Sequence, residues 1–123
     1  MNPGGAAHPS VHLSLTDPRR QVAGVFSIMR NVFVPWGAAD PDHPNIALTY
    51  WRSALDHTRR NYYFESALSP YVVMVDLNKI DYAQGSGVRS LALEGEEGFK
   101  VQGEINAAFK PAQPISYLAP ENP

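Results

Sequence analysis

The chain contains no cysteine among its 123 residues. This absence excludes disulfide bonds, thiolate metal sites and a cysteine nucleophile within the chain. Long apolar runs are also missing, because even the stretch Ser69–Val75 is far shorter than the roughly 20 residues of a membrane helix. We therefore expect no membrane partner.

Charge of either sign is scarce. Charged residues make up 18% of the chain and the net charge is −2, which gives no electrostatic basis for binding nucleic acid. The apolar share of 44% is that of a globular protein. At 123 residues we expect at most one domain with a modest core.

Proline and glycine are abundant by contrast, with eleven and nine copies that cluster at both ends and in residues 36–44. Such residues interrupt regular structure. We expect a flexible lead-in over residues 1–15 and an extended tail over 110–123. The compact part is then predicted to span residues 16–109.

One helix is predicted at the start of this compact part. Asp17 can cap free backbone N–H groups and Pro18 suits the first helical position. Apolar residues then recur at helical spacing, namely Val22, Val25, Phe26, Met29 and Phe33. The helix is expected to end near Val34, because Pro35 cannot continue it.

Several strands are predicted after a loop, over residues 46–55, 62–67, 71–76 and 88–93. Turns are expected at 56–61 and 85–87, and residues 98–109 fit either a strand or a short helix. One helix with three to four antiparallel strands indicates the α+β class. Since one helix covers only part of one sheet face, the pattern is typical of part of a larger layered protein.

Arg52 is the most informative charged residue. Strand alternation places it on the same side as Leu48, Tyr50 and Ala54. It lies either on a solvated face or in a pocket, and the residues alone leave both open. Nearby aromatic residues could line a pocket or form cross-strand pairs, namely Trp51, Tyr62, Tyr63, Phe64 and Tyr71.

Other residue types with chemical potential do not form recognisable sites. His8 and His12 lie in the expected lead-in, and His57 lies in a turn. The serine-hydrolase pattern Gly-x-Ser-x-Gly is absent, and the acidic residues near Glu96 read as a solvated loop. We expect neither a metal site nor a cofactor.

Five segments follow one another in a characteristic order, at residues 24–35, 49–56, 61–66, 69–81 and 103–110. This ordered series resembles the C-terminal part of the choloylglycine hydrolase family, the linear amide C–N hydrolases that include bile salt hydrolases and penicillin V acylases. The resemblance covers roughly Asp17 to Phe109. It implies that the chain is part of a four-layer αββα N-terminal-nucleophile hydrolase sandwich.

The family cleaves small-molecule amide substrates with an N-terminal cysteine, whose thiolate attacks the carbonyl while its own α-amino group moves the proton. Asparagine and backbone donors stabilise the oxyanion. A second family arginine reaches the active site from a strand. In the context Thr-x-Trp-Arg-x-x-x-Asp, Arg52 resembles that catalytic residue.

The chain departs from the family because it has no cysteine and no segment matching the family's N-terminal part. We therefore expect this chain alone to be inactive. Two other interpretations stay open, a non-catalytic binding or interaction module and a truncated gene product. We also expect an apolar surface that the missing layers would cover, and hence a homo-oligomer. It is expected on the side of Trp51, Ser53 and Leu55 and at the Val72/Met74 or Val73/Val75 pairs.

Overall fold

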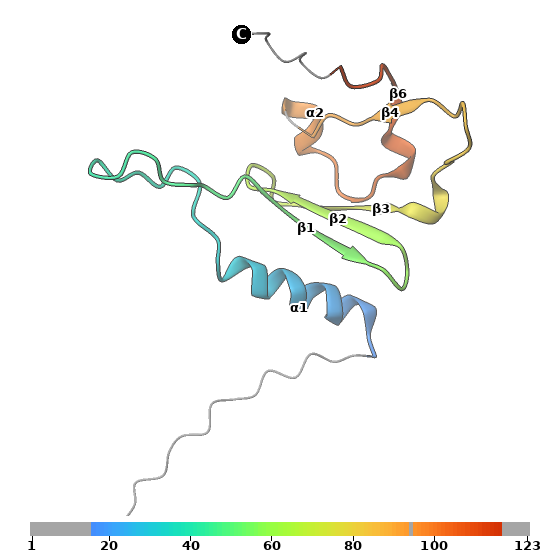
Figure 1. Cartoon of the computed structure of the whole chain (residues 1–123). Helices are drawn as coiled ribbons and strands as arrows, with labels where there is room; N and C mark the ends of the chain where they lie inside the picture. Colours follow the sequence, from blue (N-terminus) through green and yellow to red (C-terminus); the bar gives the residue numbers. More distant parts are fainter. Residues whose placement is uncertain (1–15, 94, 117–123) are drawn as a thin grey trace, which may run out of the picture. The chain divides into compact units, whose positions relative to one another are not determined.

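The computed structural model describes residues 16–93 and 95–116 of this mixed α+β chain (Figure 1). Contacts divide the chain into two compact units, residues 1–33 and 34–123. The predicted lead-in 1–15 lies outside the described residues, as does the end of the predicted tail from 117 onward. Among the described residues, no helix combines the length and apolar character needed to cross a membrane.

The first unit contains the helix α1, Pro18–Arg30. Its predicted start is confirmed, because the Asp17 carboxylate accepts a hydrogen bond of 2.9 Å from the backbone N–H of Arg19. The predicted end near Val34 is wrong, since the helix ends at Arg30. The Asn31 side chain donates to the Ser27 carbonyl at 3.1 Å. The N–H groups of Asn31, Val32 and Phe33 bond carbonyls three residues back, which tightens the chain into turns and ends the α-helix.

Replacing Asp17 with alanine should lower the free energy of unfolding of α1 by about 1 kcal/mol, because a helix N-terminal N–H group loses its acceptor. Urea denaturation followed by circular dichroism at 222 nm measures this loss. Asp17→Asn is the matched control, since it keeps the acceptor and removes only weak, exposed ion pairs to Arg19 and Arg20. Equal losses in both variants would assign the effect to charge instead.

The second unit is built on a four-stranded sheet with the order β1-β2-β3-β5. Its strands are β1 Trp51–Asp56, β2 Asn61–Ser66, β3 Val72–Asp76 and β5 Gly103–Glu104. The first three strands pair antiparallel as predicted. The fourth, β5, pairs parallel to β3.

The predicted strand at residues 88–93 forms only β4, Val88–Ser90, and joins a different sheet. It pairs antiparallel with β6, Lys110–Ala112, which is the beginning of the predicted tail. The chain leaves the strand after Ser90, and the partly buried Leu91 and Leu93 then pack against the core.

The strand β1 begins at Trp51 rather than Ile46. The preceding residue Thr49 bonds back to the segment after the helix, where its N–H reaches the Val34 carbonyl at 3.4 Å. Its hydroxyl also accepts the Val34 N–H at 3.2 Å. These bonds hold residues 46–50 in an irregular path that local β propensity does not reveal.

The core lies on one side of the sheet, around Val73, Val75 and Ile105. The segment 98–109, for which the sequence allowed a strand or a short helix, contains both. In sequence, the helix α2 Gly95–Phe99 precedes β5 and a 3₁₀ turn, η2 Asn106–Ala108, follows it. The Asn106 amide accepts from and donates to the backbone of Asp76, both at 2.8 Å. This pair of bonds fixes η2 to the end of β3.

Candidate functional site

Arg52 lies directly opposite Glu65 in the antiparallel pair of β1 and β2. Its Nε donates a hydrogen bond of 2.7 Å to Oε2 of Glu65. The two side chains are only 12% and 7% exposed. The solvated-face interpretation of Arg52 is therefore wrong, and the guanidinium is part of a buried ion pair.

One neighbouring row of the sheet, across three strands, adjoins this pair. Ala54 lies beside Tyr63, and Tyr63 lies beside Met74, on the same side as Arg52. A charge on this side has little contact with water, so it needs a partner of opposite sign. Glu65 supplies that partner, and the pair as a whole carries no net charge.

Sequence reasoning missed Glu65. The hairpin register would have found it, since Asp56 pairs with Asn61 across the turn. Four residues farther from the turn on each strand, Arg52 pairs with Glu65. A carboxylate opposite an arginine at the same distance from a turn is the signal that identifies such a pair.

The turn itself is held by a more exposed ion pair. The Asp56 carboxylate accepts hydrogen bonds of 3.0 Å from both the backbone N–H and the Nη1 of Arg59. The backbone bond first, and then the side-chain bond, lower the pKa of Asp56 below its usual range. The neighbouring His57 is exposed in the same turn.

The five predicted aromatic residues do not form one site. Trp51 and Phe64 line an open cleft of about 570 Å³, on the side of the sheet that faces away from Arg52. Tyr62 packs against the core, and Tyr71 contacts Phe99 edge to face at 6.4 Å. Trp51 and Phe64 thus line a cleft as one interpretation predicted, whereas the contact of Tyr71 is with a helix residue and is not a cross-strand pair.

Two further aromatic residues that line this cleft were missed from the sequence. Trp36 and Tyr50 pack edge to face with ring centroids 5.1 Å apart. They come from the irregular segments before β1, where no periodicity marks them. Trp51 and Leu55 remain 60% and 45% exposed, which confirms the predicted apolar surface on this side of β1.

Comparison with known proteins shows to which family the chain belongs. A model of the linear amide C–N hydrolases, choloylglycine hydrolase family, matches residues 10–88. The chain belongs to this family. The penicillin V acylase of Pectobacterium atrosepticum is 43% identical over 100 residues, which cover 80% of this chain and 27% of that protein.

A solved structure is also similar to this chain. The penicillin V acylase from Agrobacterium tumefaciens superimposes with a TM-score of 0.73 at 40% sequence identity, over 84% of this chain and 33% of that one. This likeness confirms the predicted α+β fold. The chain therefore spans only about a quarter to a third of the length of these relatives.

The histidines form no catalytic cluster within residues 16–93 and 95–116. His43 bonds the Asp40 carboxylate at 2.9 Å on the surface, which contributes most to lowering the pKa of Asp40. No group of three or more histidine or acidic residues in the described ranges could hold a metal ion. His8, His12 and Glu94 lie outside the described residues.

Proposed function

We propose that the chain is the C-terminal portion of a hydrolase that cleaves linear amide C–N bonds. The family match over residues 10–88 carries this proposal, and the likeness to two penicillin V acylases supports it. A small-molecule amide, such as the one that gives the acylases their name, is the proposed substrate of the complete enzyme.

The nucleophile of this reaction comes from outside the chain, because these 123 residues contain no cysteine. An N-terminal thiolate attacks the amide carbonyl carbon, and the amine leaves with a proton from the α-amino group. Water then hydrolyses the thioester. The chain alone is expected to lack all amidase activity.

Arg52 is the residue of this chain that we propose for the active site. A guanidinium offers donors in a rigid fork, so it can hold a carbonyl oxygen as negative charge develops on it. Because Glu65 bonds the Nε atom at 2.7 Å, the carboxylate fixes the direction of the fork. Arg52 then acts through aimed N–H donors rather than through a net positive charge.

A second role for Arg52 is favoured by its place on the sheet. It lies on the side away from the aromatic cleft and is 12% exposed beside Glu65. Such a pair could serve only to fix strand register. The catalytic and the structural role predict different turnover for the double variant R52M/E65L.

Reuniting the chain with a complementary portion tests the proposed function. The partner is the part of the Pectobacterium atrosepticum penicillin V acylase outside the 100 matched residues, produced in the same cells. We expect penicillin V hydrolysis from the pair and none from either piece. The matched control carries alanine in place of the cysteine that we propose as the partner's N-terminal nucleophile.

Two results would contradict this proposal. Turnover by the purified chain alone would show that it carries its own nucleophile. A partner that is active with its native C-terminal piece, but neither binds nor is activated by this chain, would favour a non-catalytic module or a truncated product. The assay thus separates the hydrolase interpretation from the other two.

The exposed side of β1 leads us to propose a homo-oligomer for the isolated chain. Trp51 and Leu55 lie on the cleft side and expose apolar surface that water disfavours. Sedimentation velocity should show self-association that the complementary portion suppresses. A monomer at high concentration would contradict this.

A further inference from the structure

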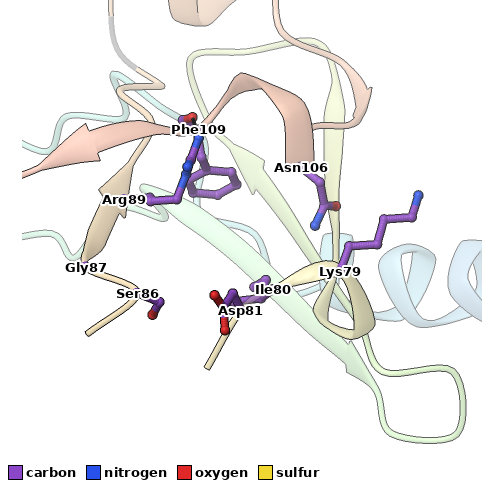
Figure 2. A pocket seen from close by; sticks show the side chains of 8 residues that line it. All are labelled: Lys79, Ile80, Asp81, Ser86, Gly87, Arg89, Asn106 and Phe109. Carbon is purple, nitrogen blue, oxygen red and sulfur yellow. Dashed lines mark hydrogen bonds between the residues drawn. The ribbon is translucent and has the colours of Figure 1, made fainter. Parts of the chain in front are cut away.

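A second cavity, of about 340 Å³, lies apart from Arg52 within the second unit. It is formed between the 3₁₀ turn η1 Leu77–Lys79, the loop that follows it, β4 and η2. Figure 2 shows Arg89 and Phe109 together at one side of this cavity and Asn106 and Lys79 at the other. Its lining also includes Ile80, Asp81, Ser86 and Gly87.

Three residues of the lining are charged, Lys79, Asp81 and Arg89, and the charge of Lys79 is already neutralised. Lys79 extends away from the cavity (Figure 2), and its Nζ bonds the Glu104 carboxylate at 2.6 Å. Arg89 instead donates from Nη2 to the backbone carbonyl of Phe109 at 2.7 Å. Within the described part of the chain, neither Arg89 nor Asp81 forms an ion pair.

Local hydrogen bonds shape the loop that carries Asp81 and leads to Arg89. The Asp81 carboxylate accepts the Ala83 N–H at 2.9 Å, and the Ser86 N–H bonds the Ala83 carbonyl at 3.1 Å. Gly87 then turns the chain into β4 with a φ of 79°, a value that glycine adopts without strain. Both charged groups are therefore positioned before any ligand arrives.

We propose that this cavity binds a small zwitterion, a free amino acid with an apolar side chain. The ligand carboxylate pairs with the Arg89 guanidinium, and the ligand ammonium pairs with the Asp81 carboxylate. The Phe109 ring and Ile80 contact the apolar side chain. A simple anion fits less well, because Asp81 would repel it.

Three residues of the lining, Arg89, Asn106 and Phe109, lie after residue 88, where the family match ends. The Asn106 amide is occupied on both sides by the Asp76 backbone and forms a rigid wall. Since the cavity is open to water, its affinity is expected to be of millimolar order.

Ligand-observed saturation-transfer NMR on the full chain tests this proposal, and it tolerates self-association. The probes are L-leucine, 4-methylpentanoate, which lacks the ammonium group, and 3-methylbutylamine, which lacks the carboxylate. We expect L-leucine to bind most tightly. Arg89→Gln and Asp81→Asn should each weaken L-leucine binding by about tenfold or more.

Lys79→Gln is the matched control, because it removes a cation from the same lining that Glu104 already neutralises. It should leave L-leucine binding within about twofold. Arg89→Lys is a second variant, needed if Arg89→Gln unfolds because its bond to the Phe109 carbonyl is lost. It keeps the cation and should bind more weakly than the parent chain but more strongly than Arg89→Gln.

Two outcomes would overturn the zwitterion site. Equal binding of L-leucine and 4-methylpentanoate, unaffected by Asp81→Asn, would make it an anion site. No saturable L-leucine signal at about a hundred times the expected dissociation constant would remove it altogether. Because no catalysis is measured, either result leaves the amide hydrolase proposal standing, and failed complementation leaves this site standing.

Discussion

Glu65→Leu should destabilise the folded chain by about 3–5 kcal/mol, because it leaves the guanidinium of Arg52 buried without its partner. Arg52 is 12% exposed and cannot lose its proton, so the charge persists in poor contact with water. Urea denaturation at neutral pH measures this loss. It is the largest stability effect that we expect from a single polar substitution in the hairpin.

Arg52→Met should cost less than Glu65→Leu, because the abandoned carboxyl group can take up a proton and become neutral. A carboxyl group that is protonated when folded stabilises the fold at low pH, and this contribution is lost as the pH rises. The Arg52→Met variant should therefore be less stable at pH 8 than at pH 5. The double variant should return to within about 1–2 kcal/mol of the parent chain.

The exposed pair of the same hairpin provides the control. Arg59 is 38% exposed and bonds Asp56 at 3.0 Å, so Arg59→Met should cost less than about 1 kcal/mol. If Glu65→Leu costs no more than this control, then water reaches Arg52 in the folded chain. That result would contradict the burial from which both proposed roles of Arg52 are argued.

The parts of the fold that local chemistry determines could be predicted from the sequence. Asp17 and Pro18 predicted the start of α1, because capping needs only neighbouring residues. The polar turn between Asp56 and Asn61 predicted the hairpin and its two strands. The apolar run of β3 predicted the third strand and its antiparallel partner.

Pairings between distant segments could not be predicted in this way. The strand β5 consists of Gly103–Glu104 alone, which is too short for any periodicity. Its parallel pairing with β3 depends on where the Asn106 amide meets Asp76, thirty residues away in sequence. Leu91 and Leu93 likewise follow β4 and pack against a core that only the folded chain defines.

The residues of the candidate site also differ in whether the sequence could predict them. Family resemblance identified Arg52, but its burial depends on what covers the sheet, which a strand's own residues do not encode. Glu65 follows from the register once the turn is fixed. Trp36 and Tyr50 meet through irregular backbone, so no spacing rule could have brought them together.

Arg52→Met in the reunited enzyme should lower kcat for penicillin V by about a hundredfold to a thousandfold, the loss that follows removal of one donor to a developing oxyanion. Steady-state release of the amine product measures it. Each preparation is normalised to its reactive cysteine by thiol titration, so that loss of folded protein is not counted as loss of catalysis. Since the donor acts in the transition state, KM should change little.

The double variant R52M/E65L decides between the two roles of Arg52. A purely structural pair predicts that this variant, once stable again, recovers the turnover of the parent enzyme. A catalytic Arg52 predicts that stability returns while kcat stays about a hundredfold low or lower, because no donor replaces the guanidinium. Arg52→Lys adds a graded readout: it keeps one charge without the rigid fork, so a catalytic role predicts an intermediate kcat. Recovery of stability without recovery of turnover cannot arise from a residue that only holds two strands in register.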